Sequence, residues 1–100
     1  MTAFSINGQM DELDVRKALQ DDRVRKATRL ILIELLRAES LHPIWPTDTL
    51  RQVEIMAGEA GEALQAGLHY AEGRGSLQAI KDELVQTGAM SLRALINLEE

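Results

Sequence analysis

An all-α fold is predicted by three features of this sequence. Long stretches are rich in Ala, Leu, Glu, Arg and Gln, which have high helix propensity, and the chain has only two prolines. Apolar residues recur at intervals of three and four, the spacing that places them on one face of an α-helix. Aromatic residues make up only 3% of the chain, so its core must consist of aliphatic side chains. We therefore expect three substantial helices and one short one.

Length and composition predict one globular domain over residues 1–100. The apolar fraction of 45% is typical of a folded protein and too high for a disordered chain. A net charge of −5 argues against a partner that is a nucleic-acid polymer, because such surfaces are basic. A nucleotide remains compatible, since metal ions and a few local cations can offset its phosphates. The absence of cysteine excludes disulfides, zinc–thiolate sites and thiol chemistry.

The sequence gives no sign of a membrane partner. No apolar run reaches the ~18 residues of a membrane span, and the N-terminal segment lacks the basic and apolar run of a signal peptide. Residues 1–9 are polar and contain Asn7 and Gly8, so we expect them to form a loose lead. A cytoplasmic protein is the expected result.

The first two helices are predicted over residues 10–20 and about 23–39, with Asp21 or Asp22 capping the second. Apolar residues of the second helix cover more than one face over residues 30–36, and this excess predicts burial on two sides. A second subunit is one way to cover the other side. The fold would then be a four-helix-bundle-like arrangement that is completed by dimerisation.

Two longer helices are predicted to follow, over residues 49–72 and 77–98. The loop before them, residues 40–48, contains two prolines, which cannot sit in a helix interior and which favour extended conformations before them. Thr47 or Asp48 can cap the next helix. The turn between the two helices contains Gly73 and Gly75, with Ser76 as the N-cap of the last helix, and a glycine in this place is typical of a left-handed C-cap.

Trp45 lies between the two prolines in a stiff segment and allows two interpretations. In the first, its side chain is a hydrophobic plug that closes one end of the helix bundle. In the second, it is a wall of a binding pocket, because a rigid indole can stack on a nucleobase.

The acidic residues on the last two helices form the one group of residues that suggests a chemical mechanism. Glu59 and Glu62 are three residues apart and share a helix face, and Glu83 and Gln86 repeat this interval on the last helix. Carboxylates that converge between close helices need a cation, because unpaired buried charge is costly. Hard oxygen ligands of this kind suit Mg²⁺, with Mn²⁺ as an alternative. The competing interpretation is an ordinary solvated helix face.

Gly58 and Gly61 lie beside the first acidic pair and lower the intrinsic helicity of this segment. Two glycines at this position suggest that something approaches the backbone closely. Ordinary tight packing between helices is the alternative.

The acidic motif resembles that of the MazG-like nucleotide pyrophosphohydrolases, a branch of the all-α NTP pyrophosphatases. These proteins are marked by ExxE, a spacer, and ExxD on the next helix. This chain reads E-A-G-E at residues 59–62 and E-L-V-Q at residues 83–86, and the likeness covers roughly residues 42–98. It departs from the family pattern at Gln86, which stands where an aspartate is expected. A glutamine carbonyl can ligate a hard cation but brings no charge, so we expect weaker metal binding or one metal fewer.

The resemblance implies hydrolysis of a nucleoside triphosphate to monophosphate and pyrophosphate. Glu59, Glu62 and Glu83 would hold magnesium with Gln86 as a further ligand, and Glu59 or Glu62 could act as the base toward the attacking water. Lys81 and Arg93, on the same helix as Glu83, are candidate phosphate contacts. The resemblance also implies a homodimer or a dimer of dimers.

Two other functions are kept as alternatives. The chain could be a nucleotide-binding or partner-binding module on the same fold, in which Gln86 marks the loss of turnover. It could also be a helical dimer whose acidic face is purely structural.

Overall fold

The structure, a computed structural model, describes residues 10–98 and is all-helical over that range. Its four helices are α1 (Glu12–Ala18), α2 (Asp22–Leu41), α3 (Thr49–Ala71) and α4 (Leu77–Asn97). The all-α prediction is therefore confirmed, and the predicted helices agree with these bounds to within about two residues at each end. The predicted loose lead, residues 1–9, lies outside the described residues.

Each helix begins at a polar side chain that accepts a hydrogen bond from a backbone N–H of its first turn. Such caps satisfy donors that have no partner within the helix. The four capping residues are Asp11, Asp21, Asp48 and Ser76. The predicted caps at Ser76 and at the start of α2 and α3 are thereby confirmed, with Asp21 and Asp48 as the residues used.

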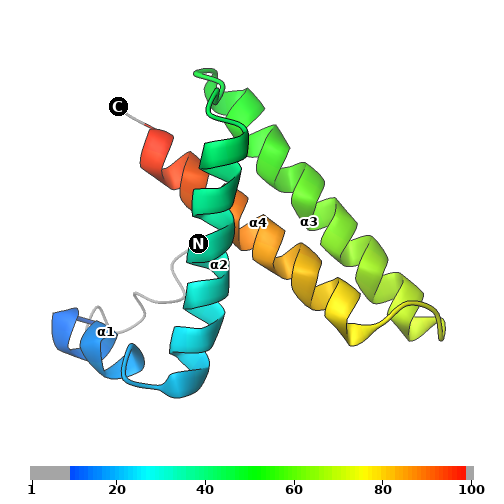
Figure 1. The fold of residues 1–100 in the computed structure, drawn as a ribbon, viewed down its shortest axis with the longest axis horizontal. Helices are drawn as coiled ribbons and strands as arrows, with labels where there is room; N and C mark the ends of the chain where they lie inside the picture. The colour runs from blue at the N-terminus through cyan, green and yellow to red at the C-terminus, as the bar shows by residue number, and fades with distance from the viewer. Residues whose placement is uncertain (1–9, 99–100) are drawn as a thin grey trace.

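The hairpin of α3 and α4 depends on two glycines in its turn. Gly73 has φ 79° and Gly75 has φ 72°, values that side chains with a Cβ rarely adopt. The turn reverses the chain, so α4 runs back along α3 over its whole length (Figure 1). This places the acidic residues of the two helices opposite one another.

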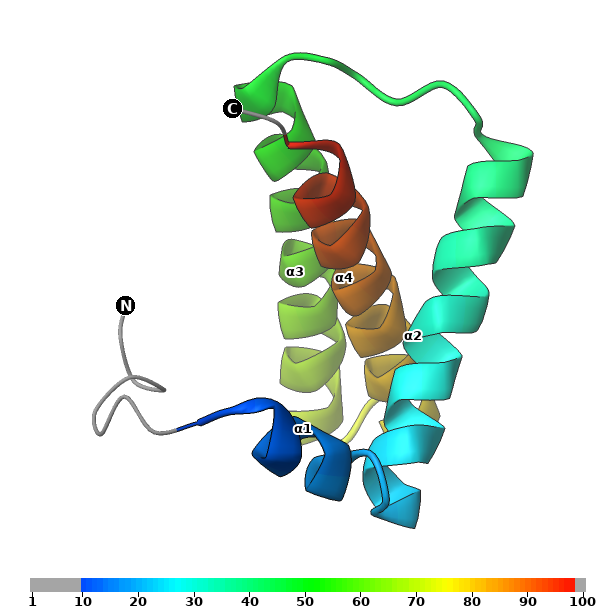
Figure 2. The ribbon, with the colours of Figure 1, turned by 90° about the vertical axis from the view of Figure 1, so that its left-hand side faces the viewer.

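Helix α2 crosses α4, and the crossing uses a third glycine. A Cβ built on Gly88 would lie 2.8 Å from Cδ1 of Ile31, closer than side chains pack. Gly88 therefore allows α2 to approach α4 at this point, with α3 on the other side of α4 (Figure 2). The short helix α1 lies beside the N-terminal end of α2 and buries none of its residues.

The core of the described chain is small and lies at the crossing of α2 and α4. Its buried residues are Leu35 and Ala38 of α2 and Ala89 and Met90 of α4. Five partly buried side chains pack against this cluster, namely Ile31, Trp45, Ile55, Met56 and Leu92.

Much of the apolar surface that the sequence pattern marks for burial stays exposed. In α2, Ile33 and Leu36 are 50% and 65% exposed, and in α3, Leu64 is 65% exposed. The reason is geometric, since α2 and α3 each pack against α4 on one side, and residues 10–98 supply no further long helix for their opposite sides. The two-sided burial predicted for α2 is thus one-sided in the single chain.

None of the helices within residues 10–98 combines the length and the apolar character that a membrane crossing requires.

Candidate metal centre

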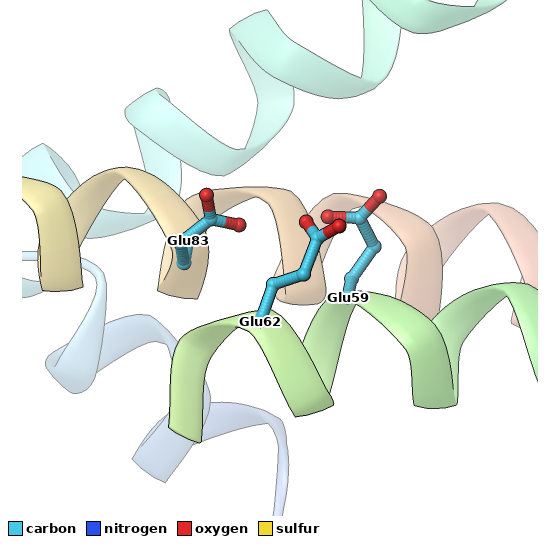
Figure 3. A group of neighbouring side chains, drawn as sticks. All are labelled: Glu59, Glu62 and Glu83. Carbon is cyan, nitrogen blue, oxygen red and sulfur yellow. The ribbon is translucent and has the colours of Figure 1, made fainter. Parts of the chain in front are cut away.

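Three carboxylates meet where α3 and α4 run side by side. Glu59 and Glu62 extend from one face of α3, and Glu83 reaches them from α4 (Figure 3). One ligand oxygen of each residue lies within 4.8 Å of the ligand oxygens of the other two. We call these residues the carboxylate trio. The i, i+3 spacing on α3 and the hairpin turn together produce this convergence.

The trio is electrostatically unfavourable without a counter-charge. Partial burial raises the pKa of Glu59 above the ordinary value, and the nearby charges of Glu62 and Glu83 raise it further. The pKa of Glu83 is raised by the same two causes, desolvation first and then the charge of Glu62. Each shift shows that the ionised form of the group is disfavoured in the folded chain.

The donor set fits a hard divalent cation. All of its ligand atoms are carboxylate oxygens, which magnesium and manganese prefer. Oε2 of Glu83 is buried and has no hydrogen-bond partner among residues 10–98. A buried acceptor of this kind is costly unless something binds it, and a cation at the trio would do so.

A pocket of about 310 Å³ adjoins the trio and brings α2, α3, α4 and the proline-containing loop together. We call it the Trp45 pocket. Its lining includes Glu59 of the trio, Gln86, Trp45 and Arg93. The structure therefore places three of the residues predicted for metal or substrate binding next to one trio carboxylate.

Trp45 and Arg93 form a stacked pair in this pocket. The guanidinium carbon of Arg93 lies 4.6 Å from the centroid of the indole, within the range of a cation–π contact. Arg93 is only 4% exposed, and it donates hydrogen bonds to the backbone oxygens of His42 at 2.6 Å and Ala38 at 3.4 Å. These bonds tie α4 to the C-terminal end of α2. Nε of Arg93 and Nε1 of Trp45 are buried without a partner in the described part of the chain.

Lys81 lies apart from the trio. It is exposed and lines a neighbouring hollow between α2 and α4, together with Asp82 and Gln86. Asp82 accepts a hydrogen bond from Gln78 at 2.8 Å and is not a member of the trio, as the helical rotation between residues 82 and 83 predicts. The roles of Lys81 and Arg93 toward a phosphate remain predictions.

The close approach predicted at Gly58 and Gly61 is not found within the chain. Among residues 10–98, no atom outside the local helix lies within 4 Å of a Cβ built at either glycine. Tight packing against another helix at these glycines is therefore not found among the described residues, and the approach of something else to the backbone stays a prediction.

One residue of the site region, Glu34, belongs to none of the motifs found in the sequence. Glu34 of α2 lines the Trp45 pocket with Glu59 and Gln86. A signal was present, because Glu34 is the one charged residue in an otherwise apolar run over residues 30–36, and an acid there needs a polar surrounding.

No protein-family model, curated protein or solved structure matches this chain. Functional inference therefore depends on the geometry of the trio and its pocket and on the motif residues themselves.

Proposed function

We propose that the protein is a magnesium-dependent nucleoside triphosphate pyrophosphohydrolase of the MazG-like kind, which releases nucleoside monophosphate and pyrophosphate. The observation that carries the proposal is the convergence of the carboxylate trio, with ligand oxygens within 4.8 Å of one another on two neighbouring helices. The ExxE motif and the glutamate of the second motif are the residues that converge. A cation bound between the three carboxylates would offset their mutual repulsion.

Each residue of the trio has a role in this proposal. Glu59, Glu62 and Glu83 would hold Mg²⁺, or Mn²⁺ in its place. When bound, such an ion neutralises charge on phosphate oxygens and favours ionisation of water. One of the two α3 glutamates accepts a proton from the attacking water.

The Trp45 pocket suits the base of a nucleotide. Its volume of about 310 Å³ lies at the lower end of the range of about 300–1,000 Å³ for small-molecule sites. Arg93 covers one face of the indole, so only the opposite face of Trp45 can take a nucleobase by stacking. The buried charge of Arg93 favours a phosphate in the same pocket, and Lys81 would contact phosphate only from the α2–α4 side.

We also propose that the chain works as a homodimer or a dimer of dimers. The proposal is supported by apolar side chains that stay exposed on α2 and α3, such as Leu36 and Leu64, which are each 65% exposed. A second subunit would cover them. Light scattering tests this assembly, and a stable monomer at micromolar concentration would contradict it.

Turnover is tested by incubating the protein with a panel of ribo- and deoxyribonucleoside triphosphates, with and without Mg²⁺, and separating the products by chromatography. We expect the wild type to release monophosphate and pyrophosphate in the presence of Mg²⁺. The Glu62→Gln variant should release neither product. Diphosphate and orthophosphate would contradict the proposed bond cleavage.

A binding module is the second candidate, and the neutral amide of Gln86 favours it, because an amide contributes less to a cation site than a carboxylate. This alternative predicts that nucleotide and Mg²⁺ together stabilise the folded protein while the nucleotide remains intact. The same panel therefore separates the two candidates.

A further inference from the structure

A second hollow, which we call the end hollow, lies at the end of the bundle opposite the hairpin turn. Its volume is about 270 Å³. It is formed where the proline-containing loop meets the start of α3 and the end of α4, by residues that include Trp45, Pro46, Thr47, Thr49, Gln52 and Asn97. None of the described residues that line it is charged, whereas the Trp45 pocket contains four charged side chains. The end hollow therefore suits an uncharged polar group.

Gln52 is the buried polar residue of this hollow. It is only 2% exposed, and its Oε1 has no hydrogen-bond partner among residues 10–98. Asn97 differs, because its amide donates to the backbone oxygen of Arg93 at 2.7 Å. A buried amide oxygen without a partner is costly, and an apolar side chain of the same shape would fill the space without that cost. The fold alone therefore gives no reason for an amide at position 52.

Trp45 adds a donor to this acceptor. Its Nε1 is also buried and also has no partner in the described part of the chain. A ligand that satisfies both groups must present a donor and an acceptor close together and carry no charge at that point. The hydrogen-bonding edge of a nucleobase has this character, and proteins read unpaired bases through it.

The position of Gln52 relative to the carboxylate trio matches the layout of a nucleotide. Gln52 and Glu59 are seven residues apart on α3, which is about two helical turns or about 10.5 Å on the same side of the helix. Trp45 lines both the end hollow and the Trp45 pocket, and Glu59 lines the Trp45 pocket. The uncharged hollow, the charged pocket and the trio thus follow one another along α3. A nucleotide has the same order, from its uncharged base to its phosphates.

We propose that the end hollow is the subsite that recognises the edge of the nucleobase, with Gln52 as a specificity-determining residue. Oε1 of Gln52 accepts a hydrogen bond from an N–H of the base, and Nε1 of Trp45 donates to an acceptor of the base. The inference rests on the proposed function, since the ligand is the nucleotide named there. It adds that the chain selects its substrate by the base, at residues that take no part in holding the metal.

The test uses nucleosides, which lack phosphates and so do not need the metal centre. Thermal unfolding of the full chain is followed in EDTA at increasing concentrations of uridine, cytidine, adenosine or guanosine. At least one nucleoside should raise the unfolding temperature of the wild type. In Gln52→Met, which keeps the unbranched shape but removes the amide, the affinity for that nucleoside should fall by about tenfold, as expected for the loss of one hydrogen bond.

Gln65→Met is the matched control. It is the same substitution on the same helix, at an exposed glutamine that does not line the end hollow, so it should leave the response to nucleosides unchanged. If Gln52→Met binds the nucleosides as the wild type does, or if none of them binds the wild type, the base subsite is refuted.

A second readout separates recognition from a structural role of Gln52. Without any ligand, Gln52→Met should unfold at a higher temperature than the wild type, because it removes a buried acceptor that has no partner. Stability gained together with binding lost is the signature of a residue kept for its ligand. A lower unfolding temperature for Gln52→Met would show that the fold itself uses the amide, and would overturn the inference.

The outcomes also distinguish this inference from the proposed function. Nucleoside binding that is lost in Gln52→Met supports the base subsite even if the wild type cleaves no triphosphate. Cleavage of triphosphates with an equal KM in the wild type and in Gln52→Met would support the hydrolase and refute the role of Gln52.

Discussion

Replacing Glu59 with glutamine should stabilise the metal-free protein. The change keeps the shape of the side chain and removes one of three charges whose ligand oxygens lie within 4.8 Å of one another. Two unit charges at that separation repel by about 1 kcal/mol in bulk water and about 3.5 kcal/mol at an effective dielectric constant of about 20. Glu62 is exposed to solvent, so the lower value applies more closely to its repulsion of Glu59.

Two repulsions disappear in this variant, one with Glu62 and one with Glu83. We therefore expect a gain in unfolding free energy of about 1–2 kcal/mol, which for a domain of this size raises the unfolding temperature by at least about 4 °C. The assay is thermal unfolding followed by circular dichroism in EDTA, at one fixed protein concentration because the proposed self-association would make the unfolding temperature concentration-dependent.

The stability gained in Glu59→Gln should decrease as the pH falls. The pKa of Glu59 in the folded chain is raised above the ordinary value of a glutamate, so its ionised form destabilises the fold. The penalty is fully present at neutral pH and is lost as the pH falls through the raised folded pKa toward the unfolded value. The stability difference between Glu59→Gln and the wild type should therefore shrink from pH 7 toward pH about 4.5.

The control for this prediction is Glu54→Gln on the same helix. Glu54 is exposed and lies 3.9 Å from Arg51, outside the trio, so its replacement should change stability little. If Glu59→Gln is no more stable than the wild type in EDTA, or if the difference does not depend on pH, the three carboxylates do not repel one another as the structure indicates.

Three further predictions concern the surroundings of the site. Gly58→Ala should raise stability by about 0.5–1 kcal/mol in urea unfolding, because alanine favours the helix and, among the described residues, no atom outside the local helix lies within 4 Å of the added Cβ; a loss would show that something packs there. Arg93→Ala should lower stability by about 2–4 kcal/mol in the same assay, since it removes the stacking on Trp45 and leaves the His42 carbonyl without its donor; a change below about 0.5 kcal/mol would refute this structural role. Ile33→Glu should shift the mass in light scattering toward that of the monomer, because Ile33 is a 50% exposed apolar side chain of α2 that a second subunit would cover; an unchanged oligomer would place the interface elsewhere.

Local features of the fold could be predicted because each depends on a short stretch of sequence. The caps at Asp48 and Ser76 follow from side chains that can accept a bond from the first turn, and the hairpin turn follows from Gly73 and Gly75. The convergence of Glu59, Glu62 and Glu83 could be predicted for the same reason, since it needs only helical spacing and a hairpin.

Features that depend on the packing of distant segments could not be predicted. The position of Glu34 follows from the rotation of α2 against α4, which is set by the close contact between Ile31 and Gly88. The stacking of Arg93 on Trp45 joins residues 48 positions apart, and no local pattern encodes it. The exposure of Leu36 was not predictable either, because apolar periodicity marks a face for burial without saying whether the same chain covers it.

The central claim is that the carboxylate trio binds a divalent cation, and calorimetric titration of Mn²⁺ into the metal-free protein tests it most directly. The structure predicts that Mn²⁺ binds the wild type saturably. The affinity should fall by at least about tenfold in Glu62→Gln and stay unchanged in Glu54→Gln. Equal binding to the wild type and to Glu62→Gln, or no binding to the wild type, would contradict the assignment of Glu59, Glu62 and Glu83 as a metal centre.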